Sequence, residues 1–133
     1  RVAFAGVLAS QPDVLIFDEP TAGLDPQGRK HMLSLFARLH AETGMTLLLI
    51  THDMDQVLEY AERVIVMEDA QVAFDGLPLD LFKEGTLLEQ FHLDLPHVLS
   101  LAWQVADRRG LQRPEIRTET ELIEWLMTKG VSE

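Results

Sequence analysis

Two short, mostly apolar runs that each end in polar residues constrain the fold of this chain most. The first run covers residues 14–17 and is followed by Asp18-Glu19; the second covers residues 46–50 and is followed by Thr51-His52. Because neither run alternates apolar with polar residues, both predict strands covered on two faces, as in a parallel sheet. The carboxyl ends of parallel strands share one edge, where α/β proteins bind ligands, so we expect these polar residues at one rim.

Helix signals follow each of the two strands. Asp25-Pro26 predicts an N-cap followed by proline in the first helical turn, and Gly44 predicts the end of that helix. The apolar face of this helix is predicted at Met32, Leu35, Phe36 and Leu39. A shorter helix follows the second strand, with one face formed by Val57, Leu58 and Ala61.

Two more strands are predicted at residues 63–67 and 71–74, paired as a hairpin across residues 68–70. The order strand, helix, strand, helix, strand, strand predicts an α/β fold with half of a mostly parallel sheet and an antiparallel edge. Residues 1–10 are rich in Ala, Val and Leu, so we expect them to form the end of a buried helix.

The pattern changes to helices after Gly76. A short helix is predicted at residues 79–83, a longer one over residues 96–109, and a last one opened by a capping box at residues 118–121. The apolar stripe of the long helix is predicted at Val98, Leu101, Ala102 and Val105, and that of the last helix at Leu122, Ile123 and Leu126. We therefore divide the chain into an α/β part, residues 1–76, and a small all-helical C-terminal extension, residues 77–133.

The composition excludes several classes of function. Asp plus Glu is 22 and Lys plus Arg is 11, a formal net charge of -11, which argues against nucleic acid as a partner. The chain has no Cys, which excludes disulfides and thiolate sites. The four histidines His31, His40, His92 and His97 have no partners at metal-ligand spacing, so we predict no metal site there.

The residues after the two strands carry the candidate chemistry. An apolar strand that ends in an aspartate, as at Asp18, is the Walker B arrangement, in which the aspartate orders Mg²⁺ beside the phosphates of a nucleotide, usually through water. Glu19 can then orient or deprotonate the attacking water. By themselves, two acids after a strand are more often solvated, and a lone histidine such as His52 is more often a structural hydrogen-bonding residue.

The neighbouring residues change that balance. The run Leu15 to Pro26, which contains Asp-Glu-Pro-Thr-Ala-Gly-Leu-Asp, closely resembles the Walker B motif and D-loop of ATP-binding-cassette ATPases, and residues 50–53 resemble their switch histidine. The resemblance implies a partial P-loop NTPase fold that binds ATP and Mg²⁺. It implies Asp18 as the magnesium residue, acting through water, Glu19 as the catalytic glutamate, and His52 as the residue that contacts the γ-phosphate and the attacking water. It also implies a D-loop that crosses a dimer interface, formed by Ala22, Gly23, Leu24 and Asp25.

The phosphate-cradling loop of that family is not found in these residues. The nearest match is residues 23–30, where Arg29 stands in place of the lysine, Lys30 in place of Ser or Thr, and Asp25 would repel phosphate. We interpret this run as a chance match and expect the Walker A, Q-loop and signature motifs upstream of Arg1, because residues 1–5 resemble the helix that follows the signature. The isolated 133-residue chain is therefore predicted to lack ATP turnover and to aggregate.

Residues 21–29 and 91–96 are similar to the energy-coupling-factor ATPases of vitamin and metal importers, and residues 19–23 resemble the second of their two paralogous ATPases. This implies a transport-coupled ATPase at the cytoplasmic face of the membrane. Its implied partners are a second ATPase subunit, identical or paralogous, a transmembrane coupling subunit and a substrate-binding membrane subunit. In that family the tail helices of two ATPases pack together, so Trp103 and Trp125 are either partner anchors or ordinary core residues.

Two alternatives stay open. The chain could be part of another cassette ATPase, either of a conventional transporter or of the DNA-repair and chromosome-organising type, although it has no sustained heptads and is acidic. It could also be a dimerisation fragment, through residues 77–133, without activity of its own.

Overall fold

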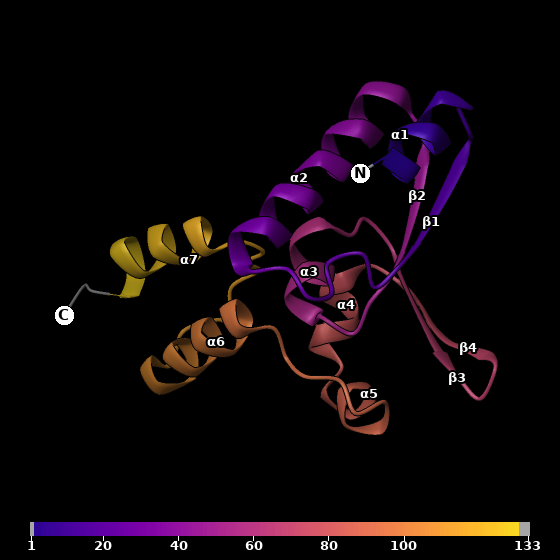
Figure 1. Ribbon diagram of the computed structural model, residues 1–133. Helices are drawn as coiled ribbons and strands as arrows, with labels where there is room; N and C mark the ends of the chain where they lie inside the picture. Colours follow the sequence, from indigo (N-terminus) through magenta and orange to yellow (C-terminus); the bar gives the residue numbers. More distant parts are fainter. Residues whose placement is uncertain (1, 131–133) are drawn as a thin grey trace. The chain divides into compact units, whose positions relative to one another are not determined.

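The computed structural model describes residues 2–130, and the chain divides into two compact units, Arg1–His52 and Asp53–Glu133. Both units combine helices with a pair of strands, so the predicted mixed α/β class is confirmed (Figure 1). The helices from residue 77 onward confirm an all-helical C-terminal region. In the described residues, no helix combines the length and the hydropathy needed to cross a membrane.

The first unit contains α1 (Val2–Ala9), β1 (Val14–Asp18), α2 (Pro26–Thr43) and β2 (Thr46–Ile50). The two strands pair in parallel, in a register that runs from Val14 opposite Thr46 to Asp18 opposite Ile50. Helix α2 begins after Asp25, whose side chain accepts a hydrogen bond from the Gly28 N–H, and it ends at Gly44 in the left-handed conformation (φ 69°). Both predicted ends of this helix are thus confirmed.

Helix α2 covers one face of the β1–β2 pair. The rings of Phe17 and Phe36 stack with centroids 4.4 Å apart, and Leu15 is buried on the same face of β1. The opposite face carries exposed apolar side chains from both strands, Val14, Ile16, Leu48 and Ile50. The prediction that both strands are covered on two faces is therefore wrong for one face of this pair. In the described residues, α2 covers the face of Leu15 and Phe17, whereas the face of Ile16 is exposed.

The prediction of a buried first helix is also wrong for the end of α1. Val7 is 47% exposed, and its neighbours from Gly6 to Ser10 are exposed or half-buried. Arg1 lies outside the described residues.

In its described part, up to residue 130, the second unit contains two strands and five α-helices, ending in a π-helical turn. In chain order they are α3 (Met54–Tyr60), β3 (Val64–Glu68), β4 (Gln71–Gly76), α4 (Pro78–Lys83), α5 (Gly85–Gln90), α6 (His97–Arg109), α7 (Glu119–Trp125) and η1 (Leu126–Gly130). The sequence did not predict α5. The capping box at Thr118 is confirmed, since both of its hydrogen bonds are present.

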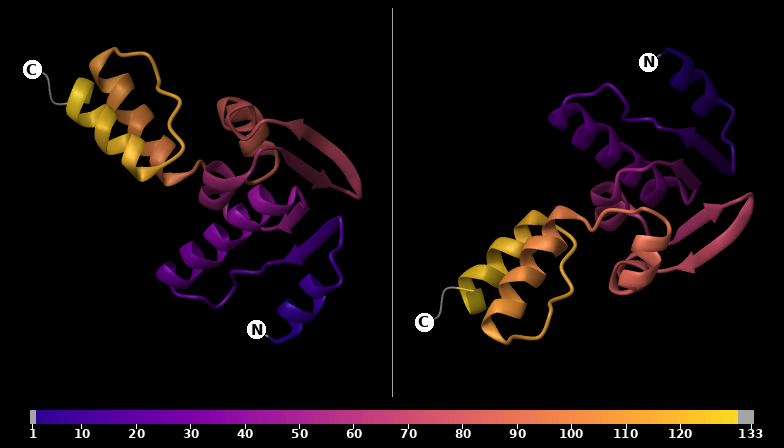
Figure 2. Two further views of the ribbon diagram at one scale, coloured as in Figure 1. Left: turned by 90° about the horizontal axis from the view of Figure 1, so that it is seen from above. Right: turned by 90° about the horizontal axis from the view of Figure 1, so that it is seen from below.

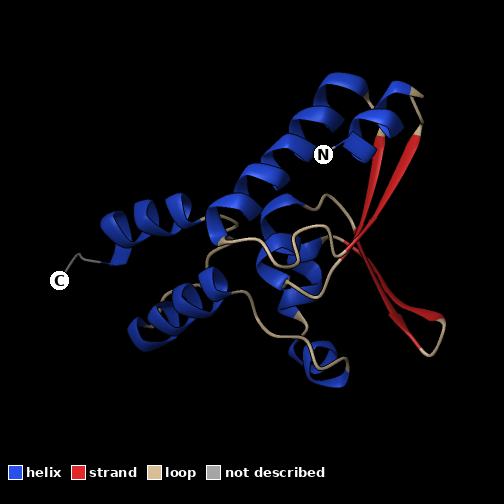
Figure 3. Cartoon of the chain, viewed as in Figure 1, coloured by secondary structure: helices blue, strands red, loops and turns tan. Residues whose placement is uncertain are grey.

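The predicted hairpin is confirmed, but the single sheet is not. Strands β3 and β4 pair antiparallel, with a bulge at Val66 and Met67, and the views of Figure 2 show the hairpin with its two arrows in opposite directions. The strands form two separate pairs, β1–β2 and β3–β4, instead of one sheet (Figure 3). The physical reason lies in α3, which follows β2 and buries Met54, Val57 and Leu58 in the core of the second unit. The hairpin then packs Val66 and Phe74 against that same core.

One hydrophobic core joins α3 to the helices of the extension. Its buried members are Met54, Val57, Leu58, Leu81, Phe82, Leu88, Leu99, Ala102, Trp103, Ile116 and Leu122. Residues on both sides of position 76 share this core, so the functional division at residue 76 stays a prediction. Trp125 is half-buried and packs against the same cluster.

The structure corrects the apolar stripes predicted for the extension. In α6 the buried residues are Leu99, Ala102, Trp103 and Ala106, whereas Leu101 is 49% exposed. In α7 Leu122 is buried but Ile123 is 56% exposed. Because apolar residues lie on two sides of α6, their spacing fits more than one stripe, and packing in the core shared with α3, α4 and α7 selects one of them.

Trp103 belongs to the protein core and is not a partner anchor. It is 7% exposed, and its Nε1–H donates a hydrogen bond to the Pro114 carbonyl oxygen over 3.0 Å. The Arg113 guanidinium lies over the ring, 5.1 Å from its centroid. A buried indole with a satisfied N–H is typical of internal packing.

Two leucines of α6 test which stripe faces the core. Leu99→Ala removes a side chain that is 0% exposed and is expected to lower the free energy of unfolding by about 2–5 kcal/mol. Leu101→Ala, the matched control in the same helix, is expected to change it by no more than about 0.5 kcal/mol. Urea unfolding of the full-length protein, followed by tryptophan fluorescence, measures both. A larger loss for Leu101→Ala would restore the stripe predicted from the sequence.

Candidate functional site

The register of the β1–β2 pair brings Glu19 and His52 together, although 33 positions separate them in the chain. Asp18 lies opposite Ile50, and the Glu19 N–H donates to the Ile50 carbonyl oxygen over 2.9 Å, which extends the parallel pairing by one residue. His52 follows two residues after Ile50. Its Nδ1 lies 2.7 Å from Oε1 of Glu19.

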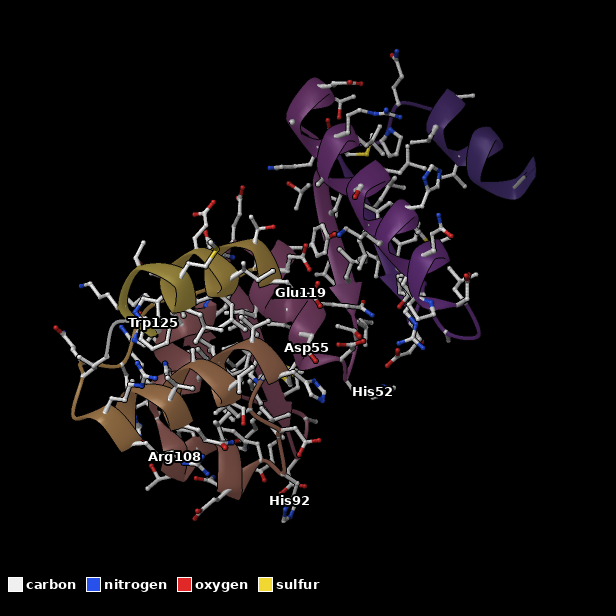
Figure 4. The ribbon with its side chains drawn as sticks, turned by 90° about the vertical axis from the view of Figure 1, so that its left-hand side faces the viewer. His52, Asp55, His92, Arg108, Glu119 and Trp125 are labelled. Carbon is white, nitrogen blue, oxygen red and sulfur yellow. The ribbon has the colours of Figure 1, made fainter. Side chains whose placement is uncertain are left out.

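This contact defines the orientation of the imidazole. Because an ionised carboxylate accepts hydrogen bonds but does not donate them, a hydrogen bond to ionised Glu19 requires a proton on Nδ1 of His52. The side chain of His52, labelled in Figure 4, is 90% exposed and that of Glu19 is 36% exposed, so both side chains are accessible to a ligand. The site thus presents one imidazole nitrogen and one carboxylate oxygen, held in a fixed relation.

Glu19 has a strained backbone. Its φ of 46° lies in the left-handed region, which costs about 1–3 kcal/mol for a residue with a side chain. Two hydrogen bonds hold it there, one from its own N–H to Ile50 and one from the Ala22 N–H to its carbonyl oxygen over 3.1 Å. Strained backbone conformations are common at functional sites, where a side chain must point in a particular direction.

Asp18 is the last residue of β1 and is exposed. Strand alternation places it on the face opposite Phe17, so its carboxylate points away from α2. Among the residues that the structure describes, no group of three or more His, Cys, Asp or Glu side chains could hold a metal ion. A single exposed carboxylate fits Mg²⁺, which retains several water ligands and binds through one or two carboxylates and substrate phosphates.

The predicted D-loop follows Glu19 directly as a series of turns. The Leu24 N–H donates to the Thr21 carbonyl oxygen over 3.2 Å, and Gly23 has a φ of 76°, a conformation that glycine adopts without strain. Arg29 reaches back from α2, where its Nε donates to the Leu24 carbonyl oxygen over 3.0 Å. The loop is therefore held from within and from α2.

The sequence did not predict that Thr21 is buried in that loop or that Arg29 donates a hydrogen bond to it. Thr21 is 4% exposed, which is unusual for a polar residue in a turn. Arg29 lies one helical turn after the N-cap Asp25, a spacing from which a long cationic side chain can reach a preceding carbonyl. That spacing is the signal from which its contact could have been predicted.

Asp25 closes the N-terminus of α2. Its Oδ1 accepts from the Gly28 N–H over 3.1 Å, and a Cβ added at position 28 would lie 2.7 Å from that oxygen, so a larger residue there would displace the capping carboxylate. The carboxylate occupies the position that a phosphate would take at the start of a helix. The geometry thus supports the interpretation of residues 23–30 as a chance match to a phosphate loop.

All six predicted site residues belong to the first unit. Glu19 and His52 are in contact, Asp18 precedes Glu19, and Gly23, Leu24 and Asp25 lie on the loop that follows it. Two of the other histidines have hydrogen-bond partners of their own. The ring of His40 contacts the Met45 carbonyl oxygen, and that of His97 contacts Asp55.

The chain is similar to ATP-binding proteins of transporters. It is 44% identical over 121 residues to the energy-coupling factor transporter ATP-binding protein EcfA2 of Ligilactobacillus salivarius, a match that covers 91% of this chain and 42% of the relative. The protein of the same name from Lacticaseibacillus paracasei is 46% identical over 96% of this chain and 44% of the relative. The one from Latilactobacillus sakei is 48% identical over 92% and 42%. No protein-family model matches the chain.

A solved structure is also similar. CbiO1 from Clostridium perfringens, described as part of the ABC transporter complex cbiONQ, superimposes with a TM-score of 0.58 and 42% sequence identity. The match covers 75% of this chain and 40% of CbiO1. The fold is therefore that of part of an ABC ATPase.

The chain spans about two-fifths of the length of the curated relatives that it matches, 42% and 44% for the first two. The identity extends over more than nine-tenths of this chain. The motifs at Asp18-Glu19 and His52 thus predicted the group of proteins to which the chain is similar, the ATP-binding proteins of energy-coupling factor transporters.

Proposed function

We propose that this chain is part of the ATP-hydrolysing subunit of an energy-coupling factor importer, with Glu19 and His52 as its hydrolytic pair. The observation that carries the proposal is the 2.7 Å contact between His52 Nδ1 and Glu19 Oε1 at the carboxyl ends of two parallel strands. The names of the relatives support the ATP-binding part of this proposal.

In the proposed mechanism, Glu19 has two tasks. One carboxylate oxygen holds the His52 ring through Nδ1, while the other orients the attacking water and accepts its proton. With its proton on Nδ1, the ring directs Nε2 toward the substrate side of the pair. A protonated ring donates from Nε2 to a phosphate oxygen and so stabilises charge that develops during transfer.

Asp18 is the residue we assign to Mg²⁺, through an intervening water. The metal ion, when bound, neutralises charge on the phosphate oxygens of ATP. The structure offers the right kind of ligand, an exposed carboxylate directly before Glu19 at the end of a rigid strand. The residues that cradle the phosphates are proposed to come from the rest of the full-length protein, since this chain covers 42% of a relative.

We further propose that ATP binds between two ATPase subunits, identical or paralogous, with the loop of Gly23, Leu24 and Asp25 at their interface. The loop is exposed at Gly23 and Asp25, and hydrogen bonds within it fix its shape. A second contact is proposed through the extension, where Leu101, Ile123 and Met127 are exposed apolar side chains. The same surface would serve a dimerisation fragment without activity of its own.

A transmembrane coupling subunit and a substrate-binding membrane subunit complete the proposed assembly, with this protein bound peripherally at the cytoplasmic face. Support comes from CbiO1, which is described as part of a transporter complex. The transported substrate is proposed to be a vitamin or a metal ion. The formal net charge of -11 gives no support to the DNA-repair class of cassette ATPase.

Glu19→Gln tests the catalytic glutamate. The amide still accepts a hydrogen bond from His52 but is a poor base, so ATP turnover by the full-length complex should fall at least about 100-fold while ATP binding is kept. Glu42→Gln is the matched control, because Glu42 forms a solvent-exposed ion pair with Arg38 at 3.9 Å and should leave turnover unchanged. Undiminished hydrolysis by Glu19→Gln would remove Glu19 from the proposed role.

His52→Asn separates the two ring nitrogens. The Asn amide can replace Nδ1–H as the donor to Glu19, but it has no atom at the position of Nε2. If Nε2 contacts the phosphate, this variant should lose turnover by about 100-fold, the same loss that is expected of His52→Ala. Steady-state ATPase rates of the full-length complex decide the point. A turnover close to that of the unmodified protein would show that the donor to Glu19 is sufficient.

A further inference from the structure

Helix α3 is attached at its N-terminal turn to the first residue of α6. Both oxygens of Asp55 accept hydrogen bonds from His97, Oδ1 from the backbone N–H over 2.8 Å and Oδ2 from Nδ1 over 2.6 Å. The N-cap residue of α6, Pro96, makes no side-chain capping bond. Asp55, labelled in Figure 4, therefore caps α6 from another helix, and this contact links α3 to α6.

The C-terminal end of α3 is attached to the segment before α7. The Arg117 guanidinium donates from Nε to the Leu58 carbonyl oxygen over 2.8 Å and from Nη2 to that of Ala61 over 2.5 Å. These carbonyls belong to the last turn and C-cap of α3, where helical acceptors lack partners within the helix. Arg117 thus completes the end of α3.

Arg117 is itself held in place. Its backbone N–H donates to Oε2 of Glu121 over 2.7 Å, and the same oxygen accepts from the Thr118 N–H in the capping box of α7. The two attachments of α3 are independent of each other, since one comes from the start of α6 and the other from the start of α7. Between them, α3 buries Met54, Val57 and Leu58 in the core shared with the extension.

Helix α3 begins two residues after His52, so these attachments lie close in the chain to the proposed hydrolytic pair. Its N-cap, Asp53, accepts from the Gln56 N–H over 3.2 Å and is bonded directly to His52. The backbone that carries the His52 side chain therefore continues into a helix whose two ends are both held by residues 97–117.

We propose that the C-terminal extension restrains His52 through α3, with His97 and Arg117 as positioning residues for ATP hydrolysis. This inference rests on the proposed role of His52. It assigns the extension a part in turnover in addition to subunit contacts, so that contacts made by the extension and the hydrolytic pair influence each other.

The charge of His97 supports the attachment at Asp55. The hydrogen bond and then the charge of Asp55 raise the pKa of the His97 imidazole above its usual value, and Asp53 and Asp94 add to this rise. The contact is an ion pair while His97 is protonated. It weakens as the pH rises through that raised pKa, because the neutral ring keeps the hydrogen bond but loses the charge.

The test compares His97→Ala and His97→Asn in the full-length protein within its assembled complex. His97→Ala removes the Nδ1 donor and is expected to lower kcat by about 3- to 10-fold, with the KM for ATP changed less than twofold. His97→Asn places an amide N–H close to the position of Nδ1 and is expected to restore most of kcat. Arg117→Ala should lower kcat in the same range, and Arg117→Lys, which retains one donor, should lower it less.

Two exposed residues of the same kinds serve as controls, His31→Ala in α2 and Arg108→Ala in α6, and both should keep the unmodified kcat (Figure 4 labels Arg108). An unchanged kcat in His97→Ala and Arg117→Ala would overturn the inference. So would a fall that follows the folded fraction, measured by thermal unfolding, and is not rescued by His97→Asn. If either alanine variant does not fold, His97→Asn and Arg117→Lys decide between the same outcomes.

Glu19→Gln, measured in the same assay, keeps this test separate from the proposed function. Hydrolysis that persists in Glu19→Gln would refute the site itself. An inactive Glu19→Gln together with a fully active His97→Ala would refute only the role of the extension.

Discussion

Parallel pairing of β1 with β2 is the constraint on which the candidate site depends. A parallel register sets which residues leave the two strands side by side, and here Asp18 lies opposite Ile50. One further hydrogen bond, from Glu19 to Ile50, carries the pairing past the last residue of the strand. The contact between Glu19 and His52 follows from that alignment. A shift by one residue would turn every side chain of the strand to the other face and separate the pair.

The two faces of this strand pair differ in how far they are covered. Helix α2 covers the face of Phe17, whereas Ile16 is 65% exposed on the other. Strands that are apolar on both faces are typical of sheets covered by helices on both sides. The sequence of β1 and β2 therefore suits a larger α/β domain, in agreement with relatives of which this chain spans about two-fifths, 42% and 44% in two cases.

The second unit is built around α3, a helix of seven residues that could not be stable alone. Its apolar face lies in the core, and side chains from two distant segments complete its ends. Polar contacts of this kind do more than add stability, because they specify where each end of the helix lies. That is why a short helix directly after His52 can hold a defined position.

Much of this organisation can be inferred from the order of residues alone. Helix ends at Asp25 and Gly44, the capping box at Thr118 and the apolar strands arise from local backbone chemistry, which acts over a few residues. The motif around Asp18-Glu19 was sufficient to point to the transporter ATP-binding proteins that the chain resembles. Other features required the chain to be folded in space: the pairing of strands into two sheets, the side of α6 that faces the core, and the contacts of Glu19 with His52 and of Asp55 with His97. These involve partners 33 and 42 positions apart, and no local preference specifies which distant residue a side chain meets.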